Sequence, residues 1–221
     1  MPSSKPEILV VNPNANAAVT DAMAAALAGL AAGTAVTIRT QTLEGAPFGI
    51  ESETDAAIVA PMLAALLRQE RSRYDAFVIG CFLDPGLNAC REAAGKPVFG
   101  IGECAIYAAL TQADQFGVLA LSRTSVARHK PIYRRLGVWD RLAGELPLEI
   151  SVAEAVGDVT VYPRILARAR ELRDEYGAGA VVLGCAGMAQ HRSALQDALG
   201  IAVIDPVQAG VSRAVSEILA R

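Results

Sequence analysis

The sequence lacks any apolar run that approaches the ~18 residues required by a membrane-spanning helix. Its amino terminus leads directly into the segment beginning at Glu7, without the apolar core of a secretory signal peptide. We therefore expect a cytoplasmic protein that makes no contact with a membrane.

A concentration of positive charge is also missing. The 221 residues include 20 Lys and Arg against 23 Asp and Glu, for a formal net charge of -3, and no stretch is dense in Lys or Arg. Nucleic acids and anionic membranes both bind concentrated basic surfaces. The absence of a basic stretch argues against nucleic acid or an anionic membrane as the main partner. We expect the partner to be a small neutral or polar molecule instead.

The usual signatures of bound metals and dinucleotides are absent as well. None of the four cysteines lies in a Cys-x-x-Cys pattern, and in the cytoplasm all four should be reduced. The first predicted strand is followed by Asn12-Pro-Asn14, where a dinucleotide-binding protein would carry Gly-x-Gly-x-x-Gly. We expect no metal and no cofactor.

What the sequence does contain is a regular alternation of short Val/Ile/Leu-rich runs with longer Ala/Leu-rich stretches, which is typical of parallel βαβ units. We predict eight strands, at residues 7–12, 35–40, 76–81, 97–101, 116–121, 147–152, 179–184 and 201–205.

The eight strands divide into two halves with the same order of features. In each half a strand leads into a polar loop, and a later strand ends in Gly-Cys, once at Cys81 and once at Cys185. We predict an α/β fold of two pseudo-symmetric lobes, each a four-stranded, mainly parallel sheet flanked by helices, with the active site in the cleft between them. Residues 1–112 would form the first lobe and 113–205 the second, with a final helix, 206–221, packing back on the first. A single continuous sheet is the alternative.

Capping residues support these boundaries. Asp84-Pro85 and Asp205-Pro206 each combine an N-cap residue with a proline at the first helical position. Gly95 and Gly200 stand where helix C-caps are expected.

The two Gly-Cys strand ends carry the strongest chemical signal. Ligands of parallel sheets bind beyond the carboxyl ends of the strands, so Cys81 and Cys185 should face one cleft. A nearby helix amino terminus would favour the thiolate of each. Two opposed thiols can remove a proton from one face of a carbon and return one to the other, which inverts a stereocentre without a cofactor. The backbone amides of Phe82, Leu83, Ala186 and Gly187 would stabilise the enolate.

Other polar residues give weaker signals. Asn14 suits loop capping and ligand binding equally well, and Ser122 and Arg123 are predicted to line the pocket from the second lobe. His129 lies in a basic stretch that we expect to be a solvated surface, and neither it nor His191 is predicted to be catalytic. Cys90 and Cys104 fall inside helical segments, where we expect them to serve packing alone.

Several motifs together resemble the aspartate/glutamate racemase superfamily and, within it, the hydantoin and allantoin racemases. They are Ile8 to Asn14, Gly49 to Ser52, Cys81-Phe82 with Asp84 to Leu87, Gly100 to Glu103, and Leu183 to Ala189. The resemblance implies cofactor-independent two-base proton transfer by Cys81 and Cys185, a cyclic ureide as substrate, and a homo-oligomer. It alone adds Ile50 and Glu51 to the site. Leu83 and Ala15 depart from the pattern, where a glycine and a threonine are expected.

The sequence therefore predicts an isomerase that inverts the C5 stereocentre of 5-monosubstituted hydantoins or of allantoin. Another enzyme of the superfamily is an alternative: an amino-acid racemase, an arylmalonate decarboxylase or a maleate isomerase. An alternative of a different class is a two-lobed protein that binds a small molecule without catalysis.

Overall fold

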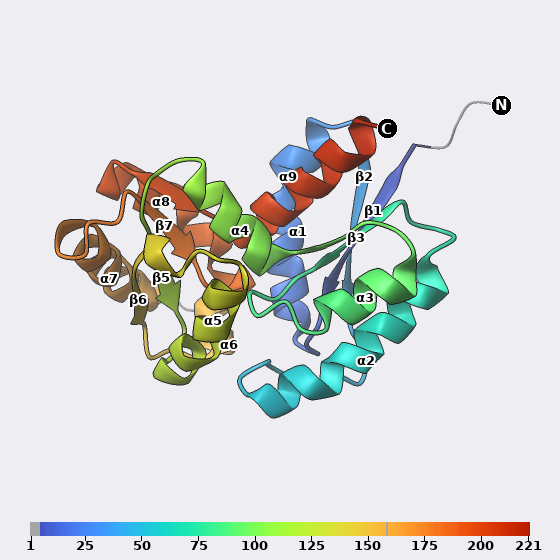
Figure 1. Ribbon diagram of the computed structural model, residues 1–221, viewed down its shortest axis with the longest axis horizontal. Helices are drawn as coiled ribbons and strands as arrows, with labels where there is room; N and C mark the ends of the chain where they lie inside the picture. The colour runs from blue at the N-terminus through green and yellow to red at the C-terminus, as the bar shows by residue number, and fades with distance from the viewer. Residues whose placement is uncertain (1–4, 158) are drawn as a thin grey trace.

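The computed structural model describes residues 5–157 and 159–221. They form two four-stranded sheets that lie side by side, each flanked by helices (Figure 1), as the sequence predicted. The first sheet contains β1 (Glu7–Asn12), β2 (Thr37–Thr42), β3 (Ala76–Ile79) and β4 (Val98–Gly100), and the second contains β5 (Phe116–Ala120), β6 (Leu142–Pro147), β7 (Ala180–Leu183) and β8 (Ala202–Ile204).

Both sheets have the same topology. The strand orders are β2-β1-β3-β4 and β6-β5-β7-β8, and every pairing is parallel. The central strands β3 and β7 are buried along their whole length, which explains their continuous apolar sequences. Each of them ends immediately before a Gly-Cys pair, so the two cysteines occupy equivalent positions in the two lobes.

The helices lie between successive strands, except for the last one, which follows β8. They are α1 (Ala17–Ala32), α2 (Glu53–Glu70), α3 (Leu87–Ala94), α4 (Ile101–Leu110), α5 (Arg123–Arg135), α6 (Val152–Gly157), α7 (Tyr162–Asp174), α8 (Arg192–Leu199) and α9 (Pro206–Leu219), with short 3₁₀ segments η1 (Trp139–Arg141), η2 (Val159–Val161) and η3 (Ala186–His191). Among the described residues, no helix is long and apolar enough to cross a membrane.

The lobes are joined by helices that cross between them (Figure 1). Helix α4 follows the first sheet in sequence but packs against β7 and β8 of the second sheet, whereas α9 follows the second sheet and packs against β3 and β4 of the first. The two helices also pack against each other. Because each of these helices packs on the sheet of the other half of the chain, the packing does not divide the chain cleanly at residue 112. The predicted lobe boundary there stays a prediction.

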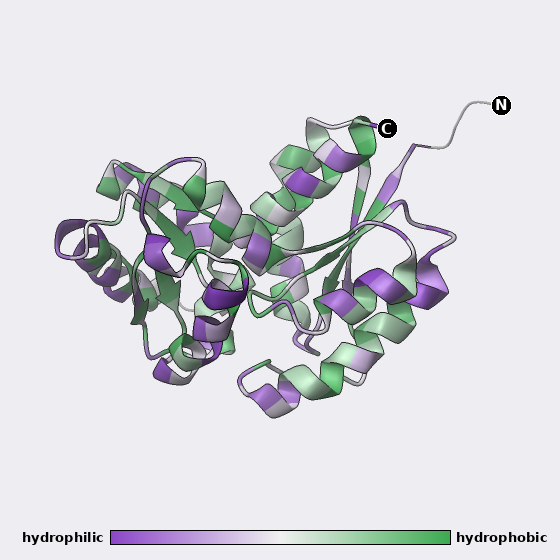
Figure 2. Cartoon of the chain, in the orientation of Figure 1, coloured by the Kyte–Doolittle hydropathy of each residue, from purple (hydrophilic) through white to green (hydrophobic). Residues whose placement is uncertain are grey.

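One hydrophobic core cluster runs through both lobes. It includes Ile8 and Val10 of β1, Leu119 of β5, Val181 of β7 and Val207 of α9. Figure 2 shows the matching pattern, with apolar residues along the strands and polar residues concentrated on the outer helix surfaces. Burial of this shared apolar surface holds the lobes together.

Two local predictions were wrong. The sixth strand is Leu142–Pro147 rather than 147–152; its sequence contains Gly144 and Glu145 and is poor in β-branched residues, so it gave no strand signal. Asp84 is not the N-cap of α3, a position taken by Gly86. In contrast, Asp205 caps α9 as predicted, and Gly95 and Gly200 are left-handed C-caps.

Candidate active site

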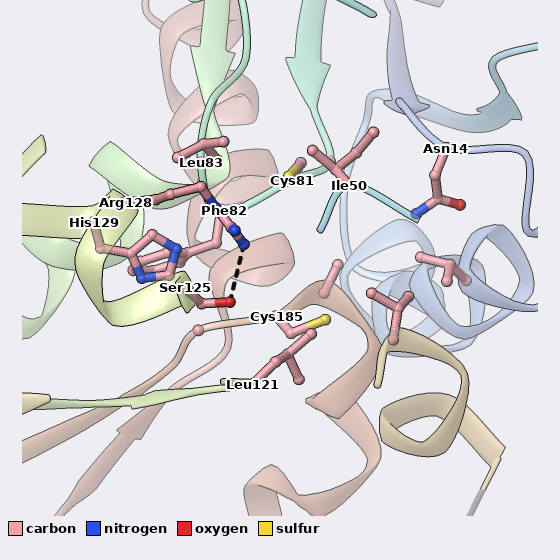
Figure 3. Close-up of a pocket in the computed structure, with 15 residues that line it drawn as sticks. Asn14, Ile50, Cys81, Phe82, Leu83, Leu121, Ser125, Arg128, His129 and Cys185 are labelled. Carbon is pink, nitrogen blue, oxygen red and sulfur yellow. Dashed lines mark hydrogen bonds between the residues drawn. The ribbon is translucent and has the colours of Figure 1, made fainter. Parts of the chain in front are cut away.

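Cys81 and Cys185 line one cavity between the two lobes. Figure 3 shows their sulfur atoms on opposite sides of this space, reached from β3 in one lobe and β7 in the other. The preceding glycines make equivalent contacts, since the N–H of Gly80 donates to Val11 O at 2.8 Å and that of Gly184 to Leu119 O at 2.9 Å. The duplicated strand ends therefore present two thiols to the same ligand volume.

Each sulfur atom accepts a hydrogen bond from the backbone two residues later. The amide of Gly187 lies 3.5 Å from Cys185 Sγ, and the amide of Leu83 makes the corresponding bond to Cys81. An N–H donor stabilises a thiolate more than a thiol, so both contacts lower the pKa of the sulfur. The repetition of this contact extends the pseudo-symmetry of the fold to the two sulfur atoms.

Burial nevertheless has the largest effect on the pKa of both thiols. It raises the pKa of Cys81 to about 12 and that of Cys185 to about 11, against the lowering effect of the amide donors. The expectation that each thiol lies at a helix amino terminus was wrong for Cys81, because α3 begins only at Leu87. It holds for Cys185, which is the N-cap of the 3₁₀ segment η3 and accepts the amide of Gly187, although burial has the larger effect on its pKa. The free protein therefore holds both residues as neutral thiols at pH 7.

Most of the predicted binding residues also reach this cavity. Its lining includes Asn14, Ile50, Phe82, Leu83 and Ala186 beside the two cysteines. Figure 3 shows the side-chain nitrogen of Asn14 pointing toward the cavity, while its Oδ1 accepts the N–H of Asn16 at 2.9 Å. Asn14 thus stabilises its own loop with one end and is available to a ligand with the other.

Four predicted residues lie outside the cavity lining, namely Glu51, Ser122, Arg123 and Gly187. Ser122 caps α5 by accepting the amide of Ser125, and the side chain of Arg123 is 87% exposed and pairs with Glu149. The backbone amide of Gly187 donates its hydrogen bond to Cys185 Sγ.

Helix α5 contributes three lining residues that the sequence did not identify, namely Ser125, Arg128 and His129. They are three and four positions apart, so they share one face of the helix. That spacing was the available signal, but the surrounding arginines and lysine suggested a solvated helix instead.

His129 is buried, and the prediction that it lies on a solvated surface was wrong. It is 4% exposed, and its Nδ1 lies 2.6 Å from Oε1 of the buried Glu145. Its ring also packs edge-on against Phe82, with the centroids 4.9 Å apart. Glu145 lies in the strand that the sequence misplaced, so its contact with His129 could not be foreseen.

Arg128 connects the two lobes across the cavity. Its Nη1 donates to the carbonyl oxygen of Glu51 at 2.6 Å, and its Nη2 donates to Ser125 Oγ at 3.1 Å. Glu51 in turn accepts the amide of Val152 through Oε1 at 3.3 Å. These contacts hold the segment carrying Ile50 over the cavity, and the Arg128 charge acts to lower the pKa of Cys81.

The other cysteines and histidine lie elsewhere. Cys90 is fully buried in the core of the first lobe, and Cys104 is partly buried in a surface groove between α4 and α9. His191 packs against Tyr162 and does not line the cavity. The described part of the chain contains no cluster of three or more His, Cys, Asp or Glu side chains arranged to hold a metal ion.

The fold and the site together define a two-lobed α/β protein with paired thiols in an interlobe cavity. A family model described as Asp/Glu/Hydantoin racemase matches residues 8–214, and the chain belongs to this family. It is therefore a racemase-type isomerase.

Individual relatives agree with this assignment. The hydantoin racemase of Paenarthrobacter aurescens is 36% identical over 206 residues, which cover 91% of this chain and 86% of that protein. The allantoin racemase from Klebsiella pneumoniae superimposes with a TM-score of 0.91 at 31% identity, over 97% of this chain and 88% of that one. Unliganded arylmalonate decarboxylase, at 17% identity and a TM-score of 0.68, shares the fold.

Proposed function

We propose that the protein racemises 5-monosubstituted hydantoins or allantoin by proton transfer between Cys81 and Cys185. The observation that carries the proposal is the presence of both sulfur atoms in one cavity, at equivalent ends of β3 and β7. A substrate ring lying between them would present one face of its C5 carbon to each thiol.

The reaction needs one thiolate and one thiol. The thiolate takes the C5 proton, and the electrons of the broken C–H bond move into the adjacent carbonyl to give an enolate. The opposite thiol then donates its proton to the other face of C5, which restores the carbonyl and leaves that sulfur as the thiolate. Atoms and charge balance, and the next turnover runs in the reverse sense.

Backbone amides near the two cysteines are suited to the enolate oxygen. Those of Leu83 and Gly187 already donate to sulfur. We therefore assign enolate stabilisation to the amides of Phe82 and Ala186, whose positions directly after the cysteines bring them close to the reacting carbon.

The remaining lining supports a ring with an apolar substituent. The cavity is bordered by Val19, Ile50, Leu83, Leu121 and Val152. Such a lining stabilises an apolar group at C5 and disfavours the exposed charge of a free amino acid. Leu83, which stands where a glycine was expected, should restrict the size of this group.

Exchange of the C5 proton with solvent deuterium tests the proposal. Each pure enantiomer of a 5-substituted hydantoin, and separately of allantoin, is incubated in D₂O with wild type, Cys81→Ser or Cys185→Ser. We expect wild type to racemise with deuterium incorporation and each variant to lose racemisation by at least about a thousandfold, because a serine hydroxyl is a far weaker acid and base.

Cys104→Ser serves as the matched control, because Cys104 lies outside the cavity, and it should retain wild-type rates. Racemisation that persists in both active-site variants would reject the two-thiol mechanism. Aspartate and an arylmalonate in the same assays test the alternative activities, and ligand-dependent thermal stabilisation without exchange would indicate a binding protein.

A further inference from the structure

The loop that carries Cys81 is attached to α4 by the side chain of Asp84. Asp84 is 4% exposed, and its two carboxylate oxygens accept the amides of Gly102 at 2.9 Å and Glu103 at 2.8 Å. Its own amide donates to the carbonyl oxygen of Cys81 at 2.9 Å. One residue therefore connects the backbone of the cysteine to the first turn of a helix.

The loop is held in an unusual backbone conformation. Asp84 has φ of +50°, a left-handed region that residues other than glycine seldom adopt. Such a conformation persists only where surrounding contacts enforce it. The two hydrogen bonds to α4 are the contacts that do so here.

The start of α4 is shaped to receive this loop. A Cβ atom at Gly100 would overlap with the carboxyl carbon of Asp84, and one at Gly102 would overlap with the carbonyl oxygen of Phe82. Both glycines are therefore needed for the close approach of the cysteine loop. This arrangement explains the occurrence of two glycines in the Gly100-Ile-Gly-Glu103 segment.

The other lobe shows what the same helix end looks like without this attachment. Helix α9 follows β8 as α4 follows β4, and it is capped by its own Asp205, whose Oδ1 accepts the amides of Val207 at 2.7 Å and Gln208 at 3.4 Å. In the first lobe, the capping carboxylate comes instead from the loop of the cysteine. A residue directly before α4 could cap that helix, as Asp205 caps α9. Capping alone therefore does not explain why the carboxylate comes from the cysteine loop.

The position of α4 gives the attachment a further consequence. Although α4 follows the first sheet, it packs against β7 and β8 of the second, and β7 leads directly to Cys185. The loop of Cys81 is thus fixed to a helix that rests on the lobe of the opposite thiol.

From this geometry we infer that Asp84 is a positioning residue that sets the placement of Cys81 relative to Cys185 across the substrate cavity. The inference rests on the proposed function, because it assigns a purpose to the spacing of the two thiols. Proton transfer is sensitive to small displacements of the reacting groups, so loss of the attachment should impair Cys81 more than Cys185.

The test compares Asp84→Asn and Asp84→Ala with Asp205→Asn and Asp205→Ala. Both substitutions at residue 84 remove its ionisable carboxyl group, whose pKa burial raises to about 7. Asparagine keeps one acceptor oxygen and alanine keeps none. A difference between them therefore reports the hydrogen bonds rather than the charge. The Asp205 variants lose a comparable helix cap that has no connection to a thiol, and urea unfolding verifies that all four proteins are folded.

The first readout is deuterium exchange from each enantiomer, with Cys81→Ser and Cys185→Ser assigning each enantiomer to the thiol that deprotonates it. The Cys81 face is the face of C5 from which Cys81 removes the proton, and the Cys185 face is the opposite one. We expect Asp84→Ala to slow exchange at the Cys81 face about tenfold or more, and Asp84→Asn to slow it less. Exchange at the Cys185 face should stay within about twofold of wild type in both variants. The Asp205 variants should leave both faces within about twofold. Three outcomes would overturn the inference. Asp84→Ala could slow exchange equally at both faces, the Asn and Ala variants could have equal effects, or Asp84→Ala could exchange at the wild-type rate.

A second readout does not depend on the substrate. The alkylation rates of Cys81 and Cys185 by iodoacetamide are measured by mass spectrometry in the same variants. Release of the loop should raise the Cys81-to-Cys185 ratio more in Asp84→Ala than in Asp84→Asn, with no change in the Asp205 variants. If wild type exchanges no hydantoin, the proposed function fails, but an unchanged ratio in Asp84→Ala is the result that rejects the positioning role.

Discussion

At the scale of single residues, both thiols have neighbours that disfavour the thiolate. Cys185 and Asp84 act to raise the pKa of Cys81 and Arg128 acts to lower it by less, while Glu51 acts to raise the pKa of Cys185. Burial has the largest effect on both thiols and raises both pKa values far above neutral pH. The thiolate required by the proposed mechanism is therefore a minor species of the free protein at pH 7.

This leads to a prediction about pH dependence. With thiol pKa values of about 12 and 11, the fraction of protein carrying one thiolate grows with pH throughout the neutral and mildly alkaline range. We expect kcat/KM for racemisation to rise about tenfold per pH unit between about pH 7 and 9. The measurement is a pH–rate profile of a 5-substituted hydantoin, corrected for spontaneous racemisation, and a plateau below about pH 8 would contradict it.

At the scale of secondary structure, α5 has two very different faces. Arg123 and Lys130 point to solvent, while Ser125, His129 and Tyr133 are buried at intervals of four residues. The inner face combines the wall of the cavity with the buried contact between His129 and Glu145. The helix therefore links the stability of the second lobe to the shape of the site.

Replacement of His129 by alanine should be strongly destabilising. It removes the partner of Glu145, which is buried, and the ring that packs on Phe82. Loss of one member of a buried, hydrogen-bonded pair costs about 3 kcal/mol. Urea unfolding should show this loss for His129→Ala, whereas Lys130→Ala, at an exposed position of the same helix, should change stability by less than about 0.5 kcal/mol. Equal stability of the two variants would argue against the buried pair.

At the scale of the whole molecule, the lobes share their packing. The largest core cluster contains residues of both sheets and of α9, and α4 and α9 each pack on the sheet of the other half of the chain. Unfolding of one lobe would therefore expose apolar surface of the other. Such coupling is the condition for a single cooperative transition.

We accordingly predict that the two lobes unfold together. The protein has one tryptophan, Trp139, which lies in η1 of the second half of the chain with the guanidinium of Arg134 over its ring. Its fluorescence reports that half alone, whereas far-ultraviolet circular dichroism reports all helices. The two urea-unfolding curves should have the same midpoint, and separate midpoints would show that the lobes unfold independently.

The sequence by itself determined the class of fold and the central pair of the site. Alternation of buried strands and helices requires only local hydrophobic patterns, and the repeated Gly-Cys strand ends marked equivalent positions in two lobes. Parallel strands bring their carboxyl ends to one edge of a sheet, so the sequence alone assigns both thiols to one cleft.

Tertiary structure alone decided the surroundings of that pair. The contacts of His129 with Glu145, of Arg128 with Glu51, and of Asp84 with Gly102 join residues that are 16, 77 and 18 positions apart. No local pattern encodes them, because they arise from the packing of one element against another. For the same reason the pKa of each thiol followed from burial within the assembled cavity and not from its place at the end of a strand.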